Sequence, residues 1–220
     1  MYPVLKRALD VIIALSGLIL LSPVLLGIAI WVKATSAGPV FYSGTRVGKD
    51  GVLFPMLKFR TMVVNADKIG ASSTSADDSR LTSTGRFLRR FKLDELPQLI
   101  NVLRGEMSFV GPRPQVEWAV KLYTAEEREL LSVRPGVTDF ASLQFRNEAE
   151  ILRGSADPDR DYLEKIAPAK IRLGLFYVRN YSFSMDASIF AATILSIAGV
   201  DPSWCLRPVA AYADPPALSS

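Results

Sequence analysis

Two adjacent carboxylates, Asp94 and Glu95, are the residues of this chain whose setting suggests chemistry. They follow the basic stretch 86–90 (RFLRR) and precede Gly-Pro-Arg-Pro at 111–114. A carboxylate can attack phosphorus to give an acyl phosphate, provided that a divalent cation or arginines reduce the repulsion from the anionic phosphate. A second carboxylate can help to hold that metal or accept a proton. An Asp-Glu pair on its own is most often solvated surface, so its surroundings decide between the two interpretations.

Other charged residues of the chain have two interpretations each. Lys58 and Arg60 share one face of a predicted strand and could clamp a phosphate, or they are solvated charges on an exposed edge. Arg113 lies between two prolines on a stiff backbone, which suits a positioned guanidinium–phosphate contact, or it is a structural arginine in a loop. A rival acidic pair, Asp77-Asp78, lies in a loop rich in Ser and Thr, and we interpret it mainly as a solvated turn.

The composition excludes several classes of site. The 220 residues include no histidine, so catalytic triads, histidine bases and histidine metal sites are excluded. The single cysteine, Cys205, excludes an internal disulfide. The absence of a Walker loop and of GxGxxG argues against P-loop and Rossmann nucleotide binding. The net charge of +4 favours anionic partners, and because no nucleic-acid reading module is present we expect no nucleic acid among them.

An uncharged apolar run, Val11–Val32, lies near the N-terminus. It is long enough to cross a hydrocarbon core and longer than a usual signal-peptide core. Ser22-Pro23 stands at its midpoint, where proline removes a backbone hydrogen bond and bends a helix, and where the Ser22 hydroxyl can satisfy the freed carbonyl. Basic residues flank both ends, as in a hairpin with both ends in the cytoplasm. A re-entrant hairpin and a proline-kinked span both remain open.

The rest of the chain predicts a mixed domain. Alternating apolar residues predict short strands within 40–64, around a turn at Lys49-Asp50-Gly51, and a polar loop follows at 65–79. Residues 84–92 predict an amphipathic helix that either lies on a membrane surface or packs on the domain. Further helices are predicted over 96–103, 115–132, 162–179 and 185–199, and a loosely ordered tail follows from Pro202.

Pro97 constrains the position of the acidic pair. Within a helix over 96–103, proline is tolerated only in the first turn. Asp94 is therefore predicted at or near the helix N-terminus, where the helix dipole stabilises a carboxylate and free amides attract phosphate.

These residues, in this order, resemble the bacterial sugar transferases known as small monotopic phosphoglycosyl transferases. The resemblance runs from about Leu5 to Ile197. Its most specific parts are Ser22-Pro23, KFRTM (58–62), the basic helix before LDELPQLINVLRGEMSFVGPRP (93–114), and RPGVT (134–138). It implies a membrane-associated α/β fold, mainly α, with an N-terminal re-entrant helix that breaks at Ser22 and Pro23 and with interfacial amphipathic helices. The expected parts are a membrane hairpin (1–35), a cytosolic and interfacial catalytic domain (36–200) and a C-terminal tail (201–220).

The resemblance also implies an activity. It implies transfer of a sugar 1-phosphate from a UDP-sugar to a polyprenyl phosphate, usually undecaprenyl phosphate, with release of UMP. The reaction would take place at the bacterial inner membrane, with the catalytic domain facing the cytoplasm, as the first membrane step of glycan assembly. Asp94 would be the nucleophile and Glu95 its partner, and the two would bind magnesium. The cations predicted to bind the substrate phosphates are Lys58, Arg60, Arg89 and Arg113.

One departure and two rival classes of function remain. After RPGVT the chain reads DFASLQFRNE (139–148), where many relatives have a GxAQVNGR-like stretch, so the identity of the sugar stays open. A non-catalytic, membrane-anchored scaffold of a glycan assembly complex could keep the same fold. A peripheral protein could instead bind anionic lipid through its basic helices. Release of UMP from a UDP-sugar would separate the enzyme from both.

Overall fold

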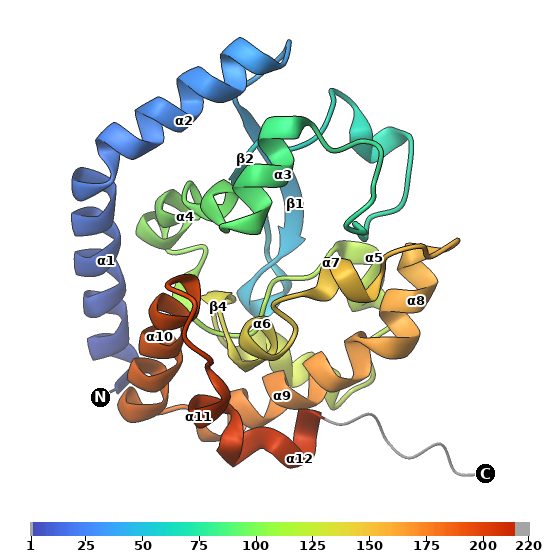
Figure 1. The fold of residues 1–220 in the computed structure, drawn as a ribbon. Helices are drawn as coiled ribbons and strands as arrows, with labels where there is room; N and C mark the ends of the chain where they lie inside the picture. The colour runs from blue at the N-terminus through green and yellow to red at the C-terminus, as the bar shows by residue number, and fades with distance from the viewer. Residues whose placement is uncertain (1, 214–220) are drawn as a thin grey trace.

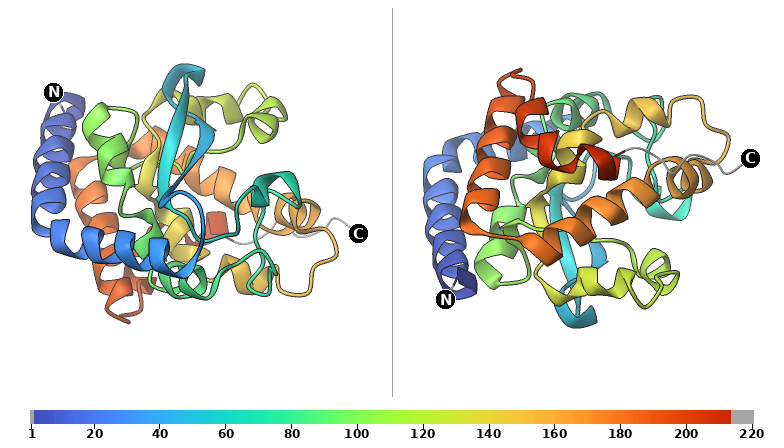
Figure 2. Two further views of the ribbon diagram at one scale, coloured as in Figure 1. Left: turned by 90° about the horizontal axis from the view of Figure 1, so that it is seen from above. Right: turned by 90° about the horizontal axis from the view of Figure 1, so that it is seen from below.

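The computed structural model of the protein describes residues 2–213. Its body is mainly helical, with two small two-stranded sheets, and its first two helices form an arm along one edge of the body (Figures 1 and 2). The predicted α/β class, mainly α, is confirmed at this level. The membrane arrangement of the arm is a separate question.

The arm consists of α1 (Tyr2–Leu20) and α2 (Ser22–Thr35), which meet at an angle of 63°. Within the described residues no single helix is long and apolar enough to cross a membrane, but this bent pair is, by length and composition. Pro23 causes the bend because it has no N–H to donate to the carbonyl of Ile19. The Ser22 hydroxyl donates to that same carbonyl at 2.8 Å, as the sequence predicts. The break is therefore a locally satisfied feature of the chain.

Each helix of the arm buries only a narrow stripe. Asp10 and Ala14 are the buried residues of α1, and Ile28 and Val32 are those of α2. The remaining faces carry large exposed apolar side chains, including Ile12, Leu15, Ile19, Leu20, Val24, Leu26 and Ile30. The body therefore leaves most of the apolar surface of the arm uncovered.

Charged side chains of α1 dock it on the body. Arg7 donates to the carbonyls of Val102 and Leu103 at 2.6 and 2.9 Å, at the C-terminal end of a helix where carbonyls lack partners in the next turn. Asp10 accepts from the Ser108 hydroxyl at 3.1 Å and from the next backbone N–H at 3.0 Å. The basic residues before the apolar run thus have structural partners, and they give less information on membrane topology than their sequence position indicates.

The predicted strands are confirmed as an antiparallel hairpin. Strand β1 (Phe41–Val47) pairs with β2 (Leu53–Phe59), with Phe41 opposite Phe59 and Val47 opposite Leu53. The turn at Lys49–Gly51 contains two residues with positive φ, Asp50 at 56° and Gly51 at 80°, which Asp and Gly tolerate better than other residues. Alternate residues of β2 face the core.

A second sheet holds the segment that carries Arg113. Strand β3 (Ser108–Val110) pairs in parallel with β4 (Gly136–Thr138). The backbones approach so closely beyond β3 that a Cβ on Gly136 would lie 2.2 Å from the nitrogen of Gly111. A side chain at Gly136 would therefore push apart the loop that follows β3.

Helices make up most of the remaining chain. They are α3 (Ser83–Arg90), α4 (Gln98–Arg104), α5 (Glu117–Lys121), α6 (Phe140–Gln144), α7 (Glu148–Ile151), α8 (Pro158–Lys165), α9 (Ala167–Asn180), α10 (Phe183–Ile197), α11 (Ser203–Leu206) and α12 (Ala210–Ala213). Short 3₁₀ turns lie at Ala66–Lys68, Leu93–Glu95, Glu127–Ser132 and Arg207–Val209. The helices predicted at 84–92, 96–103 and 185–199 correspond to α3, α4 and α10.

Two predicted helices are divided in the structure. The one expected over 115–132 is α5 followed by a 3₁₀ helix, because Thr124 and Glu127 start a new helix through reciprocal bonds between side chain and backbone of 2.7 and 3.2 Å. The one expected over 162–179 is divided between α8 and α9, because Pro168 lies in the first turn of α9.

The expectation of a loosely ordered tail is wrong for residues 203–213. They form α11, a 3₁₀ turn and α12, and Cys205 and Val209 are 5% and 0% exposed in the core. Two apolar side chains at helical spacing are enough to bury this segment against α9 and α10. The last part of the predicted tail, 214–220, lies outside the described residues. The division into three parts stays a prediction.

Candidate active site

The acidic pair lies on a short 3₁₀ turn between α3 and α4. Lys92 adopts a left-handed backbone (φ 56°) that follows α3 and leads into the turn Leu93–Glu95. Pro97 directly precedes the first residue of α4, as its tolerance for the first turn predicts. On the other side, Leu88 of α3 is fully buried against α2 and β2. Both helices that flank the pair are therefore held by the core.

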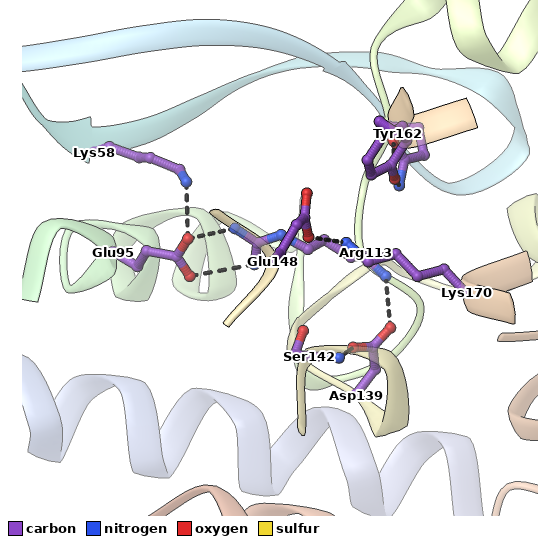
Figure 3. A network of polar contacts seen from close by, with 9 residues as sticks. Lys58, Glu95, Arg113, Asp139, Ser142, Glu148, Tyr162 and Lys170 are labelled. Carbon is purple, nitrogen blue, oxygen red and sulfur yellow. Dashed lines mark hydrogen bonds and ion pairs between the residues drawn. The ribbon is translucent and has the colours of Figure 1, made fainter. Parts of the chain in front are cut away.

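Glu95 is held by two cations. Its Oε1 accepts from Lys58 Nζ at 2.8 Å, and its two oxygens accept from the Arg113 guanidinium, one of them at 3.2 Å (Figure 3). Burial by itself would raise the pKa of Glu95, but the charges of Arg113 and Lys58 outweigh it and hold the pKa well below its usual range. The same ion pair raises the pKa of Arg113. Glu95 is therefore an ionised, fixed carboxylate.

Asp94 is also largely buried, but unlike Glu95 it has a carboxylate oxygen without a hydrogen-bond donor in the described part of the chain. It is 5% exposed, and its Oδ1 has no hydrogen-bond partner within residues 2–213. Burial raises the pKa of Asp94, Lys58 opposes that effect, and the negative charge of Glu95 adds to it. A desolvated carboxylate with an unoccupied lone pair is a better nucleophile than one that is fully hydrogen-bonded.

The predicted phosphate-binding cations lie in two places. The structure brings Lys58, Arg89 and Arg113 to the acidic pair: the first and last contact Glu95, and the charge of Arg89 opposes part of the rise in the pKa of Asp94. Within the described part of the chain, Arg89 forms no salt bridge to a carboxylate. Its charge is therefore available to a phosphate at the end of α3.

Arg60 has a different environment. It is 5% exposed, and its guanidinium donates to the carbonyls of Ala37 and Ser36 at 2.5 and 2.7 Å, directly after α2. These contacts join the strand hairpin to the end of the arm. A role of Arg60 in binding substrate stays a prediction; of its guanidinium donors, the buried Nε has no hydrogen-bond partner within residues 2–213.

Sequence reasoning missed Gln98. It is 0% exposed, and neither atom of its side-chain amide has a hydrogen-bond partner among residues 2–213. An unsatisfied buried amide costs about 1–3 kcal/mol, so each such group requires an explanation. The signal in the sequence was its spacing: Gln98 follows Asp94 by four residues, across a turn with helical backbone, so the two share a face.

The rival pair, Asp77-Asp78, has structural contacts. Asp78 forms an ion pair with Arg80 at 2.6 Å, in which both side chains are 10% exposed, and Arg80 also donates to the carbonyls of Ala66 and Ala71 at 2.9 Å. Asp77 accepts from the N–H of Gly154 at 3.2 Å. The interpretation as a solvated turn is therefore wrong for Asp78, because Arg80 pairs with it and also bonds to the backbone of the loop that contains both residues.

A metal ion would find few protein ligands here. Within the described residues there is no group of three or more acidic, cysteine or histidine side chains placed to hold one. Mg²⁺, however, usually takes one or two carboxylates and completes its shell with water and substrate phosphate. The unpartnered Oδ1 of Asp94 fits that role. Glu95 fits it less well, since both of its oxygens already accept from cations.

The comparisons with known proteins bear on this arrangement. The model of the family described as bacterial sugar transferase matches residues 1–199. The chain belongs to the bacterial sugar transferases. The predicted family and enzyme class are thereby confirmed.

Three relatives illustrate the range of the family. The exopolysaccharide production protein ExoY of Sinorhizobium fredii is 38% identical, with 87% of this chain and 84% of that protein covered. The exopolysaccharide production protein PSS of Rhizobium leguminosarum is 39% identical, with 88% and 94% covered. The UDP-glucose:undecaprenyl-phosphate glucose-1-phosphate transferase of Escherichia coli is 40% identical, with 86% of this chain but 39% of that enzyme covered. The transferase described here thus matches the small relatives over most of their length and the larger enzyme over less than half.

Proposed function

We propose that this transferase moves a sugar 1-phosphate from a UDP-sugar to a polyprenyl phosphate and releases UMP, through a covalent phosphosugar intermediate on Asp94. The observation that carries the proposal is the asymmetry of the pair: Asp94 is buried with an unpartnered oxygen, whereas Glu95 is saturated by cations. The E. coli relative is named as an enzyme that acts on UDP-glucose and undecaprenyl phosphate, which supports both substrates.

The first step forms the intermediate. A carboxylate oxygen of Asp94 attacks the phosphorus that bears the sugar, a P–O bond to Asp94 forms, and the P–O bond to UMP breaks with its electron pair leaving on UMP. Arg89 stabilises the charge on the transferred phosphate, and Arg113 that on the leaving group. Glu95 forms ion pairs with both Lys58 and Arg113, and these ion pairs hold the two cations in position.

The second step regenerates the enzyme. A phosphate oxygen of the polyprenyl phosphate attacks the same phosphorus, and the bond to Asp94 breaks, which restores the carboxylate. One phosphoanhydride is exchanged for another, so the reaction requires positioning more than an energetic drive.

We include Mg²⁺ in the proposal, held by Asp94 together with the donor phosphates. When bound, it would reduce the negative charge that the attacking carboxylate meets on the diphosphate. Glu95 would join as a ligand only through an oxygen that Lys58 or Arg113 now shares.

The arm would act as a re-entrant membrane hairpin, at the bacterial inner membrane with the catalytic body in the cytoplasm. The 63° bend and the uncovered apolar faces of α1 and α2 support this arrangement. Cysteines introduced singly as Val4→Cys and Ala34→Cys, in intact cells, should both react only when a membrane-impermeant reagent reaches the cytoplasm. Labelling from opposite sides would restore a simple span. The native Cys205 is buried and serves as the background control.

One experiment tests the enzyme as a whole. Purified protein is incubated with UDP-sugars and no acceptor, and intact-protein mass spectrometry follows the adduct while UMP is measured in solution. We expect a mass increase of one sugar phosphate per chain and one equivalent of UMP, with both lost in Asp94→Asn. Folded protein that releases no UMP from any UDP-sugar, even with polyprenyl phosphate present, would leave the scaffold interpretation in place.

A further inference from the structure

A cavity of about 240 Å³ lies on the far side of Arg113 from the acidic pair. Its walls come from the loop after β3 and from α5, α8 and α9, and they include Gln115, Tyr123, Tyr162 and Lys170. Apolar side chains such as Leu130 and Leu163 complete it. Arg113 also lines the cavity, and it is the one lining residue that the proposed mechanism uses.

Arg113 connects the cavity to the reaction centre. Its guanidinium bonds to Glu95, and it also lines the cavity. Figure 3 shows Lys58 and Glu95 at one end of this network, Tyr162 and Lys170 at the other, and Glu148 beside the Arg113 side chain between them. Arg113 therefore borders both the acidic pair and the cavity, so a molecule whose phosphates contact Arg113 has its next part beside the cavity.

A cation without a carboxylate partner lies next to this path. Arg46 of β1 forms no salt bridge to any carboxylate within residues 2–213, and its guanidinium donates to the carbonyl of Thr45 at 2.9 Å. Burial lowers the pKa of Arg46, and the nearby positive charge of Arg113 adds to that effect. Two neighbouring guanidinium groups, one of them unpaired, favour a diphosphate between them.

The polar groups of the cavity suit a flat heterocycle. The Gln115 amide and the Tyr162 hydroxyl hydrogen-bond to each other at 3.2 and 3.4 Å, which are long contacts that a ligand can replace. An amide presents one donor and one acceptor side by side, as does the edge of a uracil ring. The phenol rings of Tyr123 and Tyr162 line the cavity, and a base can stack on such a ring; Lys170 Nζ already lies over one face of the Tyr162 ring, 5.1 Å from its centroid.

We propose that this cavity binds the nucleoside of the donor, with the uracil ring against Tyr162 and Gln115 and the diphosphate passing Arg46 and Arg113 toward Asp94. The inference rests on the proposed function, since it assigns a place to one part of the same donor. The volume, below the range of about 300–1,000 Å³ usual for drug-sized ligands, suits part of the donor and not the whole nucleotide sugar.

The sugar is a poorer occupant of the same cavity. A hexose presents hydroxyls on all sides and requires several free polar partners. Here Lys170 is already paired with Glu148, and Asp139 already accepts from the backbone of Arg113 and Ser142. The remaining walls are largely apolar or aromatic.

Binding of UMP to the full-length protein in detergent tests the assignment. Tyr162→Leu removes the stacking face and should weaken UMP binding by about tenfold or more, because stacking contributes about 1–3 kcal/mol per base. Tyr162→Phe keeps the ring and should lose less. Gln115→Leu should weaken UMP by about tenfold through the loss of its paired donor and acceptor. Tyr212→Leu, the same change at an exposed tyrosine of α12, should bind UMP as the wild type does.

A labelling experiment tests the cavity with a single substitution at its opening and with all its other lining residues unchanged. Leu122 lines the cavity and is 64% exposed, so Leu122→Cys places a reactive thiol at the opening. UMP should slow its alkylation, whereas Ile151→Cys, at an exposed position outside the cavity lining, should react at the same rate with and without UMP.

The outcomes separate this inference from the proposed function. Unchanged UMP affinity in folded Tyr162→Leu and Gln115→Leu, or no UMP protection of Leu122→Cys, would overturn the assignment even if the adduct on Asp94 still forms. Variants that keep UMP affinity but change the preference among UDP-sugars would place the sugar in the cavity, which also overturns it. Loss of the adduct and of UMP release in the wild type would contradict the proposed function instead.

Discussion

Two buried carboxylates of similar exposure, Asp186 in α10 and Asp94 before α4, differ in how they are satisfied. Asp186 is 8% exposed and accepts from the hydroxyl of Tyr2, from Lys6 Nζ and, at 2.7 Å, from the hydroxyl of Tyr177. Asp94 is 5% exposed, and its Oδ1 accepts from nothing in residues 2–213. Both carboxylates are therefore buried, and they differ in whether hydrogen-bond donors and cations occupy their oxygens.

The difference follows from what each group does. A buried charge without partners is costly, so a carboxylate that only stabilises the fold gathers donors until its lone pairs are used. Asp186 fits that description: it fastens the start of α1 to α9 and α10. Asp94 retains the cost, together with the unpartnered amide of Gln98, at the place where the proposed mechanism puts the reacting phosphate.

The largest effect that tests this contrast is expected for Asp94→Asn. The amide is nearly the same size but is a poor nucleophile, so turnover should fall by about four orders of magnitude or more. The free energy of unfolding should stay the same or rise, because a buried charge has been removed. Turnover by UMP release and unfolding by denaturant titration check both. Loss of stability with near-normal turnover per folded molecule would make Asp94 a structural residue like Asp186.

Asp186→Ala should show the opposite pattern. Removal of the carboxylate leaves Lys6 without its ion-pair partner and the Tyr2 hydroxyl without its acceptor, and the carbonyl of Val110 alone remains for Lys6 and the Tyr177 hydroxyl, so the free energy of unfolding should fall by about 3–5 kcal/mol. Turnover per folded molecule should stay close to that of the wild type under conditions where the variant is folded. A variant that is stable but inactive would show that the Asp186 centre takes part in the reaction.

A smaller effect is expected at Gln98. Gln98→Met keeps the length of the side chain and removes an amide that has no partner, so the free energy of unfolding should rise by about 1 kcal/mol. Formation of the adduct should slow by about tenfold if the amide donates to the phosphate on Asp94, which is the scale of one hydrogen bond to a charged group. Single-turnover kinetics measure the rate of adduct formation, and denaturant titration measures the free energy of unfolding. A less stable variant with normal adduct formation would mean that the amide serves the fold.

Local rules predicted much of the fold. Pro23 bends the arm and Pro97 starts α4 because proline acts on the residues next to it, and the turn at Lys49–Gly51 closes the strand hairpin for a similar reason. The basic residues before the acidic pair and the Gly-Pro-Arg-Pro segment after it predicted that cations surround the pair.

Long-range contacts limited the prediction of the site. Lys58 and Arg60 would share a face only if the strand continued, but β2 ends at Phe59, so Arg60 turns to the carbonyls after α2. Arg46 and Gln98 were missed because the sequence does not show whether a buried polar group finds a partner. Burial and saturation are properties of the packed chain, and the chemistry inferred for Asp94 depends on both.

The smallest expected effect concerns the other acidic pair. Asp78 is paired with Arg80, which together with hydrogen bonds lowers the pKa of Asp78 below its ordinary 3.8, while burial partly opposes the shift. A carboxylate with a lowered pKa in the folded state contributes stability above its unfolded pKa, and that contribution disappears as the pH falls through the folded value. Asp78→Asn should therefore lower the free energy of unfolding by about 1 kcal/mol at pH 7. The gap to the wild type should begin to narrow below about pH 4 and close only below the lowered pKa of the folded state. Denaturant titrations at pH 7, 5 and about 2 measure it, with Asp50→Asn, at an exposed turn, as the control. A gap that persists in acid would mean that Asp78 acts through packing, and a loss of turnover at pH 7 in the folded variant would place this second pair with Asp94 instead of with Asp186.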